Sequence, residues 1–109
     1  MASTYKILGQ SNPSATTLTD AYTVPASTQA IVSTIVVANR SATATAFRIS
    51  CSTNGAADSN EQYIAYDVAI AGNETISFTL GISLGDTDKI RVYATLATLS
   101  FSIFGVELT

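Results

Sequence analysis

Apolar and small or polar residues alternate along most of the chain, most clearly between residues 74 and 84. The apolar positions in this stretch are Ile76, Phe78, Leu80 and Ile82. A period of two places successive side chains on opposite faces of a β-strand. The pattern therefore predicts a strand with one face in a core and the other face small and polar.

The same alternation predicts about eight short strands, separated by segments rich in Gly, Pro, Asn and Asp. The expected strands cover residues 4 to 9, 16 to 24, 29 to 39, 45 to 52, 62 to 70, 74 to 84, 89 to 95 and 98 to 108. Parallel strands need crossover helices, and the sequence has no such helical pattern. We predict a single all-β domain over residues 1 to 109, an antiparallel β-sandwich of the jelly-roll or immunoglobulin-like kind.

The apolar residues change phase within the last of these strands. Three residues share one phase and the next three take the other, namely Leu99, Phe101 and Ile103, and then Phe104, Val106 and Leu108. A β-bulge, or a strand that passes between two sheets, would produce this change, and Gly105 permits either. Burial of both faces, one in the core and one against another subunit, would produce it as well. Both interpretations stay open at this point.

Two tripeptides match the N-glycosylation pattern, at residues 39 to 41 (NRS) and 73 to 75 (NET). The chain starts without an apolar secretory signal, so we expect neither to meet the glycosylation machinery. Asn is favoured in tight turns because it tolerates a positive φ. We predict that both tripeptides lie at hairpin reversals, the first running to about Ala44, with Arg40 as a surface contact.

Composition and charge narrow the classes of function. Hydrophobic residues make up 47% of the chain and charged residues 12%, which is typical of a folded protein. The net charge is −3, and the five basic residues lie far apart in the sequence. Without a basic stripe, nucleic acid is not an expected partner. A membrane is not an expected partner either, because the sequence has no apolar run long enough to span one. We expect the protein to be made in the cytoplasm.

The residue types needed for most catalysis are missing. The chain has no His and one cysteine, Cys51, so Ser-His-Asp and Cys-His triads are excluded and an intrachain disulfide is impossible. Acidic clusters at residues 58 to 61 and 86 to 88 have oxygen atoms that could bind calcium. The same residue types are also typical of turns in which side chains cap the backbone amides of the turn. We predict no enzymatic activity, no metal site and no cofactor.

Two kinds of side chain have a predicted position. Cys51 is in phase with Phe47 and Ile49, which indicates a buried, unreactive thiol. Tyr63 and Tyr66 differ by an odd number of positions, so the alternation predicts that they lie on opposite faces of one strand. At least one of them should then reach the surface or a neighbouring molecule.

Three segments resemble a known family. They are YKILGQSNPSATTLTDAYTVPASTQAIVSTIVVANRS, YIAYDVAIAGNETISFTLGISLGDTDKIRVYA and LSFSIFGVELT, which together span nearly the whole chain. They are similar to short β-proteins encoded among the structural genes of tailed bacteriophages, cyanophages included. Some small β-sandwich proteins of such phages are decoration, or cement, proteins that sit as trimers on the head, and others belong to the neck, tail or fibres. The resemblance carries no catalytic residues.

From this resemblance we predict a virion structural protein, most specifically a capsid decoration protein that bridges neighbouring major capsid proteins as a homotrimer. It would be assembled on the virion after synthesis in the host cytoplasm. The alternatives are a tail, neck or fibre component, and a carbohydrate- or host-surface-binding module with exposed tyrosines. The N-terminal segment, residues 1 to 13, is expected to be either a contact arm or an ordinary edge strand. The candidate interface residues are Tyr5, Ile7, Leu8, Arg40, Tyr63, Tyr66 and Phe104.

Overall fold

This computed structural model describes residues 2 to 109. The described residues contain nine β-strands and two 3-10 turns, joined by connecting segments. The strands are β1 (Ser3–Ser11), β2 (Thr19–Thr23), β3 (Gln29–Asn39), β4 (Thr45–Ser52), β5 (Tyr63–Ile70), β6 (Thr75–Phe78), β7 (Ile82–Leu84), β8 (Lys89–Ala94) and β9 (Leu99–Leu108). The turns are η1 (Thr53–Gly55) and η2 (Asn60–Gln62). The predicted ranges of β3 and β4 match the structure at both ends.

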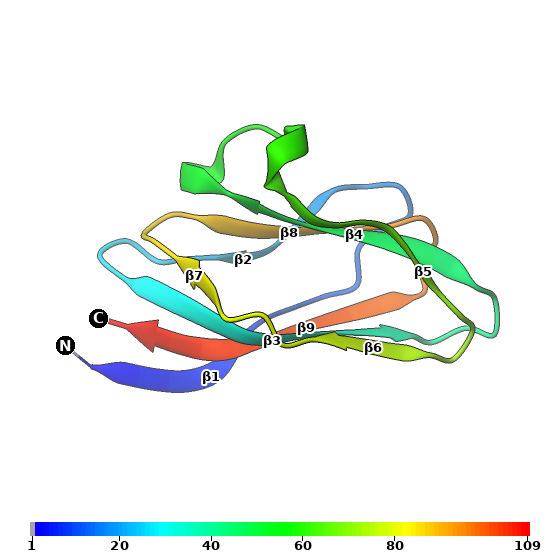
Figure 1. Cartoon of the computed structure of the whole chain (residues 1–109), viewed down its shortest axis with the longest axis horizontal. Helices are drawn as coiled ribbons and strands as arrows, with labels where there is room; N and C mark the ends of the chain where they lie inside the picture. Colours follow the sequence, from blue (N-terminus) through cyan, green and yellow to red (C-terminus); the bar gives the residue numbers. More distant parts are fainter. Residues whose placement is uncertain (1) are drawn as a thin grey trace.

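The strands form two antiparallel sheets packed face to face, seen as two layers in Figure 1. The first, called sheet A, has the order β1-β9-β3-β6, and β7 also pairs with β3. The second, called sheet B, has the order β2-β8-β4-β5. The predicted all-β antiparallel sandwich is confirmed.

The strand order distinguishes between the two predicted kinds of sandwich. If β6 and β7 are counted as one interrupted strand, each sheet has four strands, and most consecutive strands lie in opposite sheets. Two four-stranded sheets wound in this way are a jelly roll. The immunoglobulin-like order, which keeps the first two strands in one sheet, does not occur here.

Both predicted hairpins are wrong. Asn39 ends β3 in sheet A, and the following segment leads into β4 of sheet B, so the chain crosses between the layers there. The segment around Asn73 connects β5 of sheet B to β6 of sheet A in the same way. Asn73 does take a positive φ of 57°. The sequence located both reversals correctly, but alternation does not say which sheet receives the next strand.

The strand predicted over residues 74 to 84 is interrupted. Residues 79 to 81 lie outside both β6 and β7, Gly81 has a φ of 65°, and the Leu80 side chain is 54% exposed. Ile76, Phe78 and Ile82 pack against the core as expected. The period of two continues through Leu80, so periodicity alone did not reveal the break.

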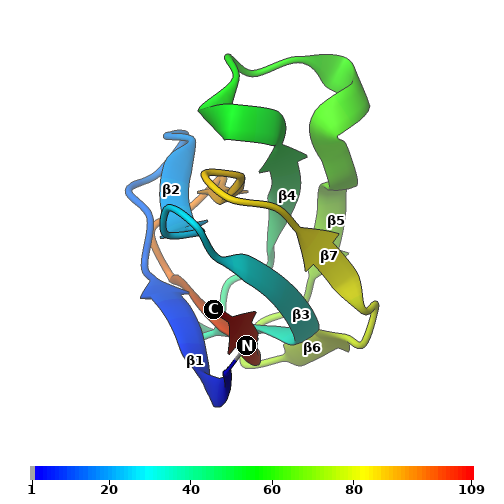
Figure 2. The same ribbon diagram turned by 90° about the vertical axis from the view of Figure 1, so that its left-hand side faces the viewer.

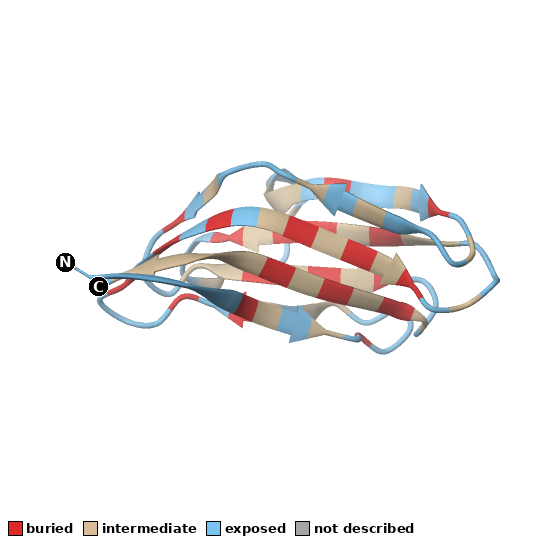
Figure 3. Cartoon of the chain, turned by 90° about the horizontal axis from the view of Figure 1, so that it is seen from below, coloured by how far each residue is buried: buried red, intermediate tan, exposed pale blue. Residues whose placement is uncertain are grey.

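The core fills the space between the two sheets. Buried and more exposed residues alternate along the strands of sheet A, as Figure 3 shows. Phe47 of β4 lies at the centre, with its ring 6.0 Å from those of Phe78 and Phe101 in edge-to-face geometry. Such pairs add to the stabilisation gained by burying apolar area. The largest fully buried side chains are Phe47, Phe101, Ile35, Ile49, Ile70, Ile90, Leu99, Ile103, Val24, Val32, Val37 and Val92.

The phase change of the apolar residues in the last strand is caused neither by a bulge in β9 nor by a change of sheet. β9 stays in sheet A over its whole length, so the interpretation as a strand that changes sheets is wrong. Its pairing shifts register between Ile7 and Gly9 of β1 and between Val32 and Thr34 of β3, both beside Phe104. The extra residues therefore lie in β1 and β3.

β9 itself keeps one alternation. Leu99, Phe101 and Ile103 point into the core, and Phe104 and Val106 point outward. Gly105 stands where the flanking strands come close, because a Cβ on this residue would lie 2.1 Å from the Ile31 carbonyl oxygen. The outward apolar residues of β9 are thus a surface feature of this chain.

Candidate functional site

The outer face of sheet A contains no charged residue within its described strands, and we call it the uncharged face. It consists of the residues that alternate with the core positions: Ser3, Tyr5, Ile7 and Gln10 of β1, Ser100, Ser102, Phe104, Val106 and Leu108 of β9, Gln29, Ile31, Thr34, Val36 and Ala38 of β3, Thr75 and Ser77 of β6, and Ser83 of β7. Lys6 and Glu107 lie on the other face of the sheet, with Nζ 3.1 Å from Oε1.

One end of the uncharged face is apolar. Val106 lies between Tyr5 on one side and Ile31 on the other, and Phe104 lies beside Ile7. The exposed fractions are 84% for Tyr5, 51% for Ile7 and 39% for Ile31. We call these five residues the apolar cluster. A charge-free surface with clustered apolar and aromatic side chains is typical of the centre of a protein interface.

The other end of this face is made mainly of small side chains. One row across the sheet runs from Gln10 through Ser102 and Val36 to Ser77. Small hydroxyl and methyl groups project only a short distance from the sheet, so a partner can approach its backbone closely. Because no charge has to be desolvated, this half of the face can be covered at little electrostatic cost.

The structure brings together three of the candidate interface residues and separates a fourth from them. Tyr5, Ile7 and Phe104 all belong to the apolar cluster. Leu8 is 9% exposed and packs in the core, so its assignment to an interface is wrong. Leu8 directly follows the outward-facing Ile7, so the ordinary alternation of the strand turns its side chain inward.

Sheet B carries a second distinct surface, an aromatic cluster around Arg48 of β4. The Arg48 guanidinium lies 4.2 Å from the ring centre of Tyr66 and 4.4 Å from that of Tyr93. Its Nε lies 2.7 Å from Oδ1 of Asp67. The contact with Asp67 raises the pKa of Arg48. The two rings and the carboxylate hold the guanidinium in place, which leaves its charge balanced on this face.

Tyr63 and Tyr66 lie together, so the prediction that they occupy opposite faces is wrong. Their rings are 5.0 Å apart at 89°. β5 shifts register twice against β4, and Asp67 has a φ of 52°. The first shift leaves Ile64 without a partner between Tyr63 and Ala65. This one extra residue reverses the alternation once between the two tyrosines, which brings their rings onto one side.

These tyrosines line a shallow hollow. It has a volume of about 380 Å³ and is lined by Asn60, Tyr63 and Tyr66. Burial, followed by the nearby Asp58, raises the pKa of the Tyr63 hydroxyl. Tyr66 is 56% exposed. Two rings and an amide at such a hollow can contact a sugar ring or an apolar side chain.

Arg40 contacts neither surface. It is an exposed residue whose guanidinium donates hydrogen bonds to Oδ1 of Asn12 at 2.9 Å and to the Ala97 carbonyl at 3.1 Å. These two contacts link the segments that follow β1 and β8. The structure thus gives Arg40 a role in joining loops of its own chain.

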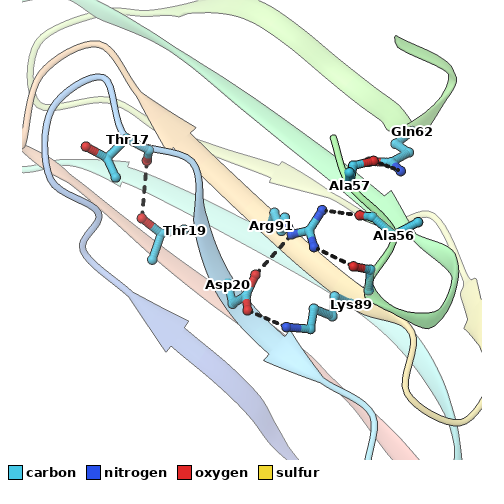
Figure 4. A network of polar contacts seen from close by, with 9 residues as sticks. Thr17, Thr19, Asp20, Ala56, Ala57, Gln62, Lys89 and Arg91 are labelled. Carbon is cyan, nitrogen blue, oxygen red and sulfur yellow. Dashed lines mark hydrogen bonds and ion pairs between the residues drawn. The ribbon is translucent and has the colours of Figure 1, made fainter. Parts of the chain in front are cut away.

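The two basic residues of β8 share one carboxylate, as shown in Figure 4. Asp20 of β2 accepts from Lys89 Nζ at 2.6 Å and from Arg91 Nε at 3.0 Å. Arg91 also donates to the carbonyls of Gly55 at 3.1 Å and Ala56 at 2.7 Å. The Lys89 contact, with Arg91, lowers the pKa of Asp20. Arg91 therefore ties the loop after β4 to β8 and β2.

In the second of the two acidic clusters that resembled calcium ligands, Asp86 and Asp88 cap backbone amides. Asp88 accepts from the N–H of Gly85 at 2.8 Å and of Asn54 at 3.0 Å, and Asp86 accepts from that of Ser27 at 3.0 Å. Within residues 2 to 109, no group of three or more His, Cys, Asp or Glu side chains is arranged to hold a metal ion.

Two further predictions concern burial and membranes. Cys51 packs against the core, and burial raises the pKa of its thiol, as expected for an unreactive cysteine. Across the part of the chain that the structure describes, no helix has the length and apolar character needed to cross a membrane.

No family model, no curated protein and no solved structure matches this chain. The resemblance to bacteriophage structural proteins therefore remains a prediction. The features of this molecule that bear on its function are the uncharged face of sheet A and the aromatic cluster of sheet B.

Sequence reasoning missed members of both surfaces. Ile31 and Val106 complete the apolar cluster, and Arg48 and Tyr93 complete the aromatic cluster. Arg48 could have been found, because it is out of phase with the buried Phe47 and Ile49. The joining of Ile31 to Val106 depends on strand order, which the sequence pattern does not specify.

Proposed function

We propose that the protein is a virion structural protein, most specifically a capsid decoration protein that docks on the particle through its uncharged face. The observation that carries this proposal is a sheet face free of charge across β1, β9, β3, β6 and β7, with an apolar cluster at one end. Jelly rolls occur in viral capsid domains and also in lectins and cupins, so the fold is compatible with the proposal without selecting it.

The proposed mechanism is stabilisation by mass action. A protein that binds the assembled lattice, and not its separated subunits, shifts the equilibrium toward the lattice. The partners would be major capsid proteins or other virion proteins, and the site of action the virion. An uncharged surface suits this role because binding does not require burial of unpaired charges. The protein would act as a homo-oligomer, a trimer by the resemblance.

The test uses particles that lack this protein, to which purified protein is added back. We expect wild type to bind and to raise the temperature at which the particles release their genome. Ser102→Asp places a charge in the middle of the uncharged face, and we expect it to weaken binding at least about tenfold. Ala69→Asp is the control, because Ala69 is an exposed residue of β5 in the other sheet. Equal binding by both variants would contradict the proposed docking face.

The position of the protein on the particle tests the alternative of a tail, neck or fibre component. Labelled protein seen over the head supports decoration. Labelled protein at the tail or neck contradicts decoration, and the uncharged face would then be a contact between tail proteins.

A carbohydrate-binding module is a second candidate function, supported by the hollow at Tyr63 and Tyr66. Aromatic rings can stack on the apolar faces of sugars, and the Asn60 amide can hydrogen-bond their hydroxyls. On a glycan array, this function requires binding that is lost in Tyr66→Ala and kept in Tyr5→Ala. An array without hits would contradict it.

A further inference from the structure

The four edges of the two sheets differ in how open they are to another strand. β6 and β7 form an edge broken at residues 79 to 81. β2 has five residues with a register shift, and β5 has two register shifts. Short, broken and bulged edges do not accept a further strand readily.

β1 is the open edge. It runs in register with β9 from Ser3 to Ile7 before the shift at Leu8, and all five residues of this stretch are exposed. Within the described residues, no strand pairs with the outer side of β1, which Figure 2 shows at the edge of the molecule. A regular exposed edge of this kind is a template for strand addition.

The direction of the backbone groups along β1 follows from one pair of hydrogen bonds. Ala2 and Thr109 donate to each other's carbonyls at 2.8 Å and 2.9 Å, so they form a hydrogen-bonded antiparallel pair. Such pairs alternate with non-hydrogen-bonded pairs along an antiparallel ladder. The N–H and C=O groups of Ser3, Tyr5 and Ile7 therefore point away from β9, toward solvent.

We propose that residues 3 to 7 of β1 pair antiparallel with the same residues of a second copy, about a two-fold axis that passes through Tyr5. Tyr5 then pairs with Tyr5 of the second copy, and Ser3 pairs with Ile7. All three outward residues obtain backbone partners, which gives six hydrogen bonds by the alternation of the ladder.

Charge and register favour this axis over its neighbours. With the axis at Tyr5, Lys6 faces Thr4 of the second copy. An axis at Lys6 would place two ammonium groups opposite each other, and it would use a residue whose backbone groups already bond to β9. An axis at Ile7 would run the pairing into the register shift at Leu8.

Lys6 does not block the edge. Charged side chains often protect edge strands from pairing. Here the Lys6 ammonium lies 3.1 Å from Glu107 of its own chain, so its charge is already balanced. In the proposed pairing its cross-strand neighbour is the neutral Thr4.

The dimer would join two copies of sheet A into one continuous sheet. A two-fold axis at β1 places both uncharged faces on the same side, with the two apolar clusters adjacent at the axis. Two-fold strand pairing closes on itself, so this assembly is a dimer and stands against the trimer implied by the resemblance. The inference rests on the edge of β1 and does not depend on the proposed function.

The first test measures the molar mass of the purified protein by light scattering, over concentrations that reach the millimolar range. We expect a concentration-dependent shift toward twice the monomer mass. A protein that stays monomeric at every concentration, or that forms trimers, would overturn the proposal.

Two substitutions at one position separate backbone pairing from side-chain contact. Tyr5→Ala and Tyr5→Pro both remove the ring, but only proline removes the outward N–H. We expect the dimer dissociation constant of Tyr5→Pro to exceed that of Tyr5→Ala about 30-fold, since two symmetry-related hydrogen bonds are lost. Circular dichroism and melting temperature confirm that both fold. Equal dissociation constants in two folded variants would overturn strand pairing.

A disulfide trap provides a second measurement that does not depend on proline. In a Cys51→Ser background, Tyr5→Cys places two thiols across the axis, at a Cα separation of about 5.5 Å that suits a disulfide. Gln10→Cys, on the same strand beyond the register shift, is the control. We expect oxidation to crosslink the first variant at least about ten times faster than the second. Equal rates would contradict the register.

Discussion

Asn39, at the end of β3, is a buried residue whose side chain joins three segments. Its amide donates to the carbonyls of Thr43 at 2.9 Å and Ala71 at 3.1 Å, and its Oδ1 accepts from the Ser41 N–H and the Thr98 hydroxyl, both at 3.1 Å. The sequence pattern placed Asn39 in a turn but gave no indication of these contacts. They hold together the connections at one end of the sandwich.

Asn39→Ala should lower the free energy of unfolding by about 3 kcal/mol, because it leaves buried carbonyl and amide groups without partners. Urea titration followed by circular dichroism measures this. Asn12→Ala is the control, since Asn12 is exposed and makes one contact with Arg40, and its effect should stay within about 0.5 kcal/mol. Equal effects of the two substitutions would contradict the role of Asn39.

Glu107 links stability to pH at the end of the sandwich where β1 and β9 pair. Its Oε2 accepts from the Tyr22 hydroxyl at 2.6 Å, and its Oε1 lies 3.1 Å from Lys6. The hydrogen bond from Tyr22, with Lys6, lowers the pKa of Glu107 below its usual 4.5. A carboxyl with a lowered folded-state pKa stabilises the fold above its unfolded pKa, and this stabilisation is lost as the pH falls through the folded value.

We expect the wild-type protein to lose stability as the pH falls below about 4.5, and Glu107→Gln to lose less over the same range because Gln does not titrate. Urea titrations between pH 7 and pH 3 give the free energy of unfolding of each protein as a function of pH. The variant should be the less stable protein at pH 7. Parallel curves would show that Glu107 makes no contribution to the acid dependence.

At the scale of elements, Arg91 of β8 holds the middle of the loop between β4 and β5. Arg91 bonds to the carbonyls of Gly55 and Ala56, whereas Lys89 on the same face bonds to Asp20. Loops held by few contacts open more readily than the strands that flank them. Arg91 thus holds Gly55 and Ala56 to β8, while Asp88 and Thr87 bond to Asn54.

Arg91→Ala should therefore increase amide hydrogen exchange in residues 53 to 62 by about tenfold while changing exchange in the core strands little. Lys89→Ala is the matched control, because it removes a contact to the same Asp20 and leaves the loop carbonyls bonded. Hydrogen exchange with mass spectrometry measures both. A similar increase in the two variants would mean that Asp20, and not the loop carbonyls, is the important partner.

The boundaries of most elements could be predicted because alternation and turn residues are local signals. The register shifts at Leu8, in β3 and in β5 could not be, since an extra residue is recognised only against its pairing partner. For this reason the sequence pattern predicts Tyr63 and Tyr66 on opposite faces. The inward position of Leu8 follows from its alternation with Ile7 and needs no register shift. The candidate site was predicted in part, through Tyr5, Ile7 and Phe104.

On the scale of the whole molecule, both sheets contribute to one core, and the first strand pairs with the last. Tyr22 of sheet B reaches Glu107 of sheet A, and Phe47 of sheet B contacts Phe78 and Phe101 of sheet A. Neither sheet can bury its inner face without the other.

Unfolding should therefore be a single cooperative transition. Far-UV circular dichroism, which follows the strands, and tyrosine fluorescence, which follows side-chain packing, should give coincident urea curves. Two separated transitions would show that the sheets unfold independently and would contradict a shared core.

The sequence by itself determined the fold class, the positions of nearly all strands and the inner face of most of them, because these depend on local alternation and composition. Tertiary structure decided the jelly-roll order, the crossings after Asn39 and Asn73, and the gathering of Tyr5, Ile31 and Val106 on one uncharged face. Strand order and register are set by contacts between residues far apart in the chain. A pattern read along the chain contains no information about which strands become neighbours.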